Sequence, residues 1–370
     1  MIKITHCVII ITECFCEIYY NNLIEVENLH SGGFFMGFQL SSAQFNDVLT
    51  QLGKHYVIYA PKIFKGQGTF SDTDRVRYGT ITQLEEIEFN EKSSFSYKEV
   101  LLPITQTLFF FTETEVKEAS MNKQNLLIFL RSCDLHAVRR LDEIYLRNGF
   151  EDVYYKKFRE KAKFVVMGCE KSFNNCFCVD METNTTDEYD AYIHIEDGQV
   201  AFDIKCEQLL KDSKIETTVS CEVIPKFVTD NAVHVEIPEK LDLRIIYSNM
   251  WEEYSERCIA CGRCNFVCPT CTCFTMQDIF YQDNKKCGER RRVWASCQVD
   301  GYTDMAGGHK FRENKGQRMR FKVMHKIYDF KKRNGYHMCV GCGRCDDVCP
   351  EYISFSNCIN KLGKAMDEVE

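Results

Sequence analysis

Short apolar runs alternate with segments of helical spacing in the first two thirds of the chain. Residues 126–130 and 164–167 are continuous apolar runs of strand length, and Leu135, Val138 and Leu141 between them fall on one face of a helix. A helix that connects two strands in this way normally makes them parallel neighbours in one sheet. Their carboxyl ends would then border a single crevice.

Capping and turn residues predict where these elements end. We expect Asp134 to cap the connecting helix and Gly149 to end it. Residues 42–52 carry a second helical pattern, and residues 192–204 alternate between apolar and polar around an Asp-Gly pair, as in a β-hairpin.

The patterns divide the chain into three parts. Residues 36–240 mix strands and helices, which predicts an α+β or α/β domain. Residues 1–35 do not read as domain structure, and we interpret them as an N-terminal extension, a leader, or residues that precede the true start of the protein. Residues 241–370 form the remaining domain, whose apolar positions near 321–330 recur at helical spacing.

Length and composition agree with a folded protein of about two domains. The chain has 370 residues, of which 45% are hydrophobic and 27% are charged, as in ordinary globular proteins. The apolar patch at residues 8–11 is interrupted by Glu13 and Glu17 too early for a signal peptide or a membrane span. We therefore expect a soluble protein without membrane contact.

Cysteine usage is the most unusual feature of the composition. Thirteen of the 22 cysteines lie between Cys258 and Cys358. Clustered CxxC motifs in a long chain without a secretory signal indicate metal binding in a reducing compartment, and not a disulfide framework. The cytoplasm is the expected location.

Two copies of the pattern C-x2-C-x2-C-x3-C-P stand far apart in the chain. They read CIACGRCNFVCP from residue 258 and CVGCGRCDDVCP from residue 339. In this pattern three closely spaced thiolates hold one 4Fe-4S cluster, and the fourth cysteine binds the other cluster. The predicted first cluster is held by Cys258, Cys261, Cys264 and Cys349, and the second by Cys339, Cys342, Cys345 and Cys268.

Structural zinc is the alternative, but zinc gains nothing from a third nearby cysteine followed by Cys-Pro. Glycines at 262, 341 and 343 would let the backbone turn tightly and offer N–H groups to the sulfurs. Seventy residues separate Cys268 from Cys339, too many for a compact hairpin-linked ferredoxin. We therefore expect an α-helical ferredoxin domain with two 4Fe-4S clusters.

A third group of cysteines lies near the predicted crevice. It consists of Cys133, Cys169, Cys176 and Cys178. A third 4Fe-4S cluster is one interpretation, and inert or zinc-bound cysteines are the other. His136 fits better as a helix residue than as a ligand, and Cys271, Cys273 and Cys297 could shield a cluster, offer alternative ligands or simply pack.

Charge and the remaining motifs restrict the function. The net charge is −8, but residues 285–333 hold fifteen Lys and Arg against five Asp and Glu, which indicates either a solvated helical face or a docking face for an acidic partner.

No dinucleotide fingerprint, P-loop or nucleophile elbow occurs, so we expect no flavin or nicotinamide site and no catalytic residue in this chain. A nucleic-acid-binding redox sensor is a remote alternative, because no docking motif accompanies the basic stretch.

Several longer phrases resemble the A subunits of anaerobic sulfite reductases over about residues 36–362. Besides the two cluster motifs, they are FSDTD at 70, NCFCV at 175, CPTCTCF at 268, GERRRVWASC at 288 and DMAGGHKFRE at 304. The β subunits of soluble sulfhydrogenase-type hydrogenases are similar more distantly. Residues 1–35 have no counterpart in the family pattern.

The resemblance implies an electron-transfer subunit in a cytoplasmic hetero-oligomer. A second subunit would bind FAD and NADH, and a third would carry sirohaem and reduce sulfite to sulfide. The resemblance also implies that Cys133, Cys169, Cys176 and Cys178 hold a third cluster. The alternative within electron transfer is the β subunit of a soluble hydrogenase.

Overall fold

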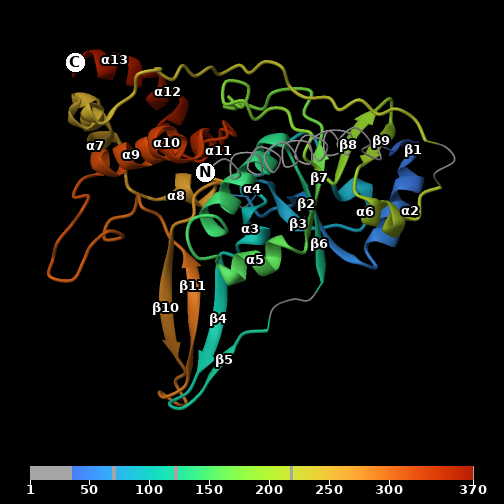
Figure 1. Ribbon diagram of the computed structural model, residues 1–370, viewed down its shortest axis with the longest axis horizontal. Coiled ribbons are helices and arrows are strands. Elements are labelled where there is room, and N and C mark those ends of the chain that lie inside the picture. The colour runs from blue at the N-terminus through green and yellow to red at the C-terminus, as the bar shows by residue number, and fades with distance from the viewer. Residues whose placement is uncertain (1–35, 69–71, 121–123, 217–219, 370) are drawn as a thin grey trace, which may run out of the picture.

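A seven-stranded mixed sheet forms the N-terminal part of the computed structural model (Figure 1), which describes residues 36–68, 72–120, 124–216 and 220–369. The expected extension 1–35 lies outside these residues. The strand order is β1 (Met36–Leu40), β9 (Gln199–Ile204), β8 (Ala191–Glu196), β7 (Ala162–Met167), β6 (Asn125–Leu130), β2 (Tyr56–Phe64) and β3 (Arg75–Thr80).

The centre of this sheet follows the sequence prediction. Strands β2, β6, β7 and β8 are parallel neighbours, and the connection from β6 to β7 contains α4 (Ser132–Tyr145) and α5 (Val153–Arg159). Strands β8 and β9 form the predicted antiparallel hairpin, with positive φ at Asp197 and Gly198. The carboxyl ends of β6 and β7 therefore share one edge, as expected.

Helices cover both faces of the sheet and build two apolar cores. On one face, α2 (Ser42–Leu52) and α6 (Glu207–Ser213) pack beside the short 3-10 helix η1 (Leu84–Glu86). The other face carries α4, α5 and α3 (Lys98–Leu101). The second core also includes Val340 and Cys342 from the second cysteine motif, so the C-terminal part is packed into it.

The ends of α4 differ from the prediction. Arg131 takes the N-cap position without a side-chain cap, and the helix ends at Tyr145, before Gly149. Asp134 lies inside the first turn, where its fully buried carboxylate accepts two hydrogen bonds of 2.8 Å from Arg344. Acidic residues favour helix starts, which is why the sequence predicts Asp134 as the cap. Its side chain instead forms an ion pair with Arg344 from a distant segment.

The C-terminal part is only partly helical. Its helical segments surround a third apolar core that contains Val323, Ile327 and Leu362. In chain order they are η3 (Leu243–Tyr247), η4 (Asn249–Trp251), α7 (Glu252–Arg257), α8 (Arg263–Phe266), α9 (Lys315–Met324), the π-helical turn η5 (His325–Asp329), α10 (Phe330–Asn334), α11 (Arg344–Asp347), α12 (Phe355–Asn360) and α13 (Leu362–Asp367).

A β-hairpin within the long insert corrects the expectation of a helical ferredoxin domain. Strands β10 (Phe274–Phe280) and β11 (Gly288–Trp294) pair with β4 (Thr105–Phe111) and β5 (Val116–Glu118) from the N-terminal part. This four-stranded β-arm projects away from the rest of the molecule (Figure 1). Most of β10 is exposed, so it lacks the apolar-polar alternation that marks a half-buried strand.

Close backbone contacts join the two parts of the chain. A Cβ added to Gly341 would lie 2.4 Å from the Phe177 carbonyl oxygen, and one added to Gly343 would lie 2.2 Å from the Asn175 carbonyl oxygen. Both glycines also have positive φ. The boundary at residue 240 stays a prediction, because segments on both sides of it share these contacts. In the described residues, no helix is both long and apolar enough to cross a bilayer.

The buried Arg344–Asp134 pair should be essential for this junction. We expect Arg344→Leu to lower the free energy of unfolding by about 3–5 kcal/mol, because it leaves the Asp134 carboxylate buried without a counter-charge. Urea unfolding of anaerobically purified protein, followed by circular dichroism, measures the loss. The double variant Arg344→Leu/Asp134→Leu should recover most of it; equal losses in the single and double variants would contradict the role of the pair.

Candidate iron-sulfur sites

The two cysteine motifs adopt the same backbone turn. The third residue of each motif has positive φ, 58° at Ala260 and 63° at Gly341. Each motif then places a glycine of positive φ before a short helix, Gly262 before α8 and Gly343 before α11. The turn brings a backbone N–H to sulfur in the first motif, where the Ala260 N–H donates to the Cys258 Sγ at 3.4 Å. The duplication seen in the sequence is therefore also a duplication of structure.

The predicted ligands of the first cluster line one cavity, which we call the outer cavity. Three thiols come from the first motif and the fourth from the end of the second: Cys258, Cys261, Cys264 and Cys349. Cys345, Lys322 and Phe355 also line it. Cys261 is exposed, so this cavity lies near the protein surface.

The predicted ligands of the second cluster line the inner cavity. They are Cys339, Cys342, Cys345 and Cys268. Lys322 and Lys326 also line this cavity, and Phe177 packs against it from the N-terminal part. Each of these two cavities thus combines three thiols of one motif with the fourth thiol of the other, and the assignment of these cysteines as ligands stays a prediction.

The four cysteines proposed for a third cluster also share a cavity, the N-terminal cavity. Cys133 begins α4, Cys169 follows β7, and Cys176 and Cys178 lie on the loop beyond it. Cys133 and Cys169 therefore border the same space, and their role as cluster ligands stays a prediction. His136 is not part of the lining, and its Nε2 lies 2.8 Å from the Thr185 carbonyl oxygen.

The donor chemistry of these cavities fits a cubane cluster. Each cavity is lined by the four thiols of its predicted set, the number that a 4Fe-4S cluster needs, and the thiols surround a space instead of meeting at a point. The outer and N-terminal cavities each share one further cysteine with the inner cavity. Within the described ranges, no three His, Cys, Asp or Glu side chains are grouped closely enough to hold one metal ion. When bound, a cluster supplies one-electron redox chemistry, and the protein supplies the thiolates and their surroundings.

Burial makes several of these thiols poor thiolates in the absence of metal. It raises the pKa of Cys178 and of Cys342 to about 12, and it raises the pKa of Cys133 and Cys345 well above the usual value. Iron must therefore replace these protons, which couples metal binding to the folding of the sites.

Buried lysines are the feature that sequence reasoning missed. Lys98, Lys322 and Lys326 are each at most 4% exposed, and no carboxylate of the described chain is ion-paired with them. Burial alone would lower the pKa of Lys322, but the thiolates of Cys264, Cys345 and Cys271 raise it well above its usual value. Part of the basic stretch 285–333 therefore faces the cluster sites, and is neither a solvated nor a docking face.

Three cysteines that the sequence left open lie beside the inner and outer cavities. A hydrogen bond from the Cys271 thiol, with the nearby charges of Lys326 and Lys98, lowers the pKa of Cys268 well below its usual range. Cys273 donates in the same way to Cys297, whose sulfur also accepts from the Asn265 Nδ2 at 3.1 Å. These contacts support packing beside the cavities, and none of these three cysteines lines one of the three cavities.

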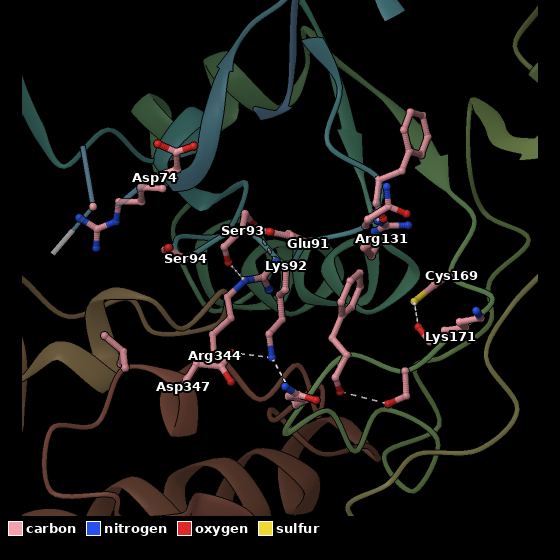
Figure 2. Close-up of a pocket in the computed structure, with 18 of the residues that line it drawn as sticks. Asp74, Glu91, Lys92, Ser93, Ser94, Arg131, Cys169, Lys171, Arg344 and Asp347 are labelled. Atoms are coloured by element: carbon pink, nitrogen blue, oxygen red, sulfur yellow. Dashed lines mark hydrogen bonds and ion pairs between the residues drawn. The ribbon is translucent and has the colours of Figure 1, made fainter. Parts of the chain in front are cut away.

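A large polar cleft opens at the carboxyl ends of β6 and β7, between the two parts of the chain (Figure 2). Cys169 of the N-terminal cavity and Cys349 of the outer cavity both line it. Lys92 crosses the cleft to pair with Asp347 at 2.6 Å and also reaches the Cys342 carbonyl oxygen at 3.1 Å. The N-terminal cavity therefore has access to solvent through this cleft.

The three cavities lie in a row. Cys342 lines both the N-terminal and the inner cavity, and Cys345 lines both the inner and the outer cavity. Cys176 also connects the N-terminal cavity to the inner cavity, because its Sγ lies 3.5 Å from the Cys342 carbonyl oxygen. The inner cavity is thus the middle of the row.

Comparisons with known proteins agree with this arrangement. Residues 257–353 match the family described as the 4Fe-4S dicluster domain. Over 317 residues the chain is 28% identical to sulfhydrogenase 2 subunit beta of Pyrococcus furiosus. The matched region covers 79% of this chain and 92% of the relative. No solved structure matches. The protein is therefore similar to a sulfhydrogenase β subunit, and its residues 257–353 are similar to the 4Fe-4S dicluster domain family. The likeness to the sulfhydrogenase subunit favours the hydrogenase resemblance over the sulfite reductase one.

Iron content separates the N-terminal site from the dicluster pair. Anaerobically purified protein should hold about twelve irons, four for each cluster. Cys176→Ser should lower the content by about four and leave the spin-coupled EPR signal of the other two clusters. Cys358→Ser changes a buried cysteine outside the three cavities and serves as the control. An unchanged iron content in Cys176→Ser, or zinc in place of iron, would contradict the assignment.

Proposed function

We propose that this chain is the iron-sulfur relay subunit of a multi-subunit oxidoreductase related to the sulfhydrogenases. The observation that carries the proposal is the row of three thiol-lined cavities. Each cavity has the donor set of one 4Fe-4S cluster, and neighbouring cavities share lining residues. Clusters in such a row pass single electrons, each cluster being oxidised by one electron as its neighbour is reduced by one.

The proposed ligand sets follow the cavities. The outer cluster takes Cys258, Cys261, Cys264 and Cys349, the inner cluster takes Cys339, Cys342, Cys345 and Cys268, and the N-terminal cluster takes Cys133, Cys169, Cys176 and Cys178.

The two ends of the row are the proposed points of electron exchange with partners. The outer cavity approaches the surface at exposed Cys261, and the N-terminal cavity reaches the polar cleft at Cys169. The inner cavity lies between them and is enclosed by buried residues of both parts of the chain, including Phe177 and Phe355. An electron that crosses the protein would therefore pass through the inner cluster.

The partners are inferred from the comparisons. The relative in Pyrococcus furiosus is named as a subunit of a sulfhydrogenase, so we propose a complex in which other subunits hold the catalytic centre and the electron donor or acceptor. A second candidate is the electron-transfer subunit of an anaerobic sulfite reductase, with an FAD/NADH subunit and a sirohaem subunit. The phrases CPTCTCF and DMAGGHKFRE favour this candidate.

Co-purification tests the proposal and distinguishes the two candidates. Affinity-purified native complex should contain this chain with further redox subunits, identified by mass spectrometry. Cluster reduction by H2 would support the sulfhydrogenase type, whereas reduction by NADH and reoxidation by sulfite would support the sulfite reductase type. Cys342→Ser should slow electron transfer through the complex at least tenfold, because it removes a ligand of the middle cluster. Normal transfer in that variant would contradict the relay.

A further inference from the structure

Positive charge is distributed unevenly along the three cavities. Two buried lysines, Lys322 and Lys326, line the inner cavity. Lys322 is the one buried cation among the residues that line the outer cavity, whose lining also includes exposed Arg263 and the acidic residues Asp346 and Glu351. The Lys326 Nζ donates to the Thr270 Oγ1 at 2.8 Å, and the Lys322 Nζ lies 5.1 Å from the centre of the Phe355 ring. These neighbours are neutral, so neither ammonium group has lost its charge to a carboxylate in the described structure.

The N-terminal cavity has a different charge balance. Two of the cations that line it are neutralised, since Lys92 pairs with Asp347 at 2.6 Å and Arg344 with Asp134 at 2.8 Å. Arg131 is the remaining cation, and it donates to the carbonyl oxygens of Gly168 and Phe89. The inner cavity therefore carries more buried, uncompensated positive charge than either of its neighbours.

A fixed positive charge favours the more negative state of a nearby cluster. Four thiolates make a 4Fe-4S site anionic, and reduction adds one further negative charge. Burial opposes reduction because low-dielectric surroundings disfavour charge, but an ammonium group held in the same dry region acts with little screening. The two lysines thus act against the effect of burial at the inner cluster.

We propose that Lys326 and Lys322 are positioning residues that raise the reduction potential of the inner cluster above those of the outer and N-terminal clusters. This inference rests on the proposed function and gives the middle of the relay a role of its own. A cluster held by the inner cysteines would then retain an electron longest, while clusters held at the two ends of the row would exchange electrons with partners. Loss of one lysine charge would then change the potential without removing any ligand.

An EPR-monitored redox titration of the full-length holoprotein tests the proposal. Lys326→Met removes the charge and keeps most of the side-chain volume. At a fixed solution potential, it should lower the ratio of reduced to oxidised inner cluster at least tenfold. For a one-electron couple, this corresponds to a fall of about 59 mV in the reduction potential. Lys322→Met should lower the potential of the inner and outer clusters, because Lys322 lines both cavities.

The matched control is Lys332→Met, the same change at an exposed position six residues beyond Lys326. It should shift no couple. Lys326→Arg keeps the charge and should stay close to the wild-type potential. If Lys326→Met does not load iron, the two shifts expected in Lys322→Met decide the matter.

Two failures can be told apart. Wild-type protein that loads no clusters would overturn the proposed function itself. Wild-type and variant proteins that hold equal iron and titrate identically would overturn only the role of the lysines, as would an equal shift in Lys332→Met.

Discussion

Every proposed cluster site depends on thiols from segments that are distant in the sequence. The loop of residues 339–345 contributes to all three sites, because it supplies three thiols to the inner cavity and also lines both of the neighbouring cavities. This loop fits only because Gly341 and Gly343 allow its backbone to approach Phe177 and Asn175 closely. The contact joins the N-terminal sheet to the dicluster part and places the third set of cysteines next to the other two.

Charge is the second requirement that follows from this packing. Bringing anionic clusters into a region of low dielectric needs counter-charge or hydrogen-bond donors in the same region. The protein meets this need with buried cations from three different segments: Lys98 on α3, Lys322 on α9 and Lys326 in the π-helical turn after it. Part of the basic stretch 285–333 therefore supplies buried positive charge beside the proposed cluster sites, a role that the net charge alone does not reveal.

Local sequence patterns predicted the parts whose structure is set locally. The β6-α4-β7 unit follows from apolar periodicity, and the twelve thiols follow from motif spacing, the crevice rule and the family resemblance. The β-arm could not be predicted in this way, because β10 is largely exposed and its sheet is completed by β4 from 170 residues earlier in the chain. The buried lysines were missed for a related reason: a helical basic stretch reads as solvent-facing until the segments that cover it are known.

The most direct test of the central claim is to locate iron in the folded protein. Anomalous diffraction at the iron absorption edge, from anaerobically grown crystals, should show iron in the N-terminal, inner and outer cavities, in that order along the row. Iron missing from the inner cavity, or a single metal ion in place of a cluster there, would contradict the account, because the two ends would then have no connection.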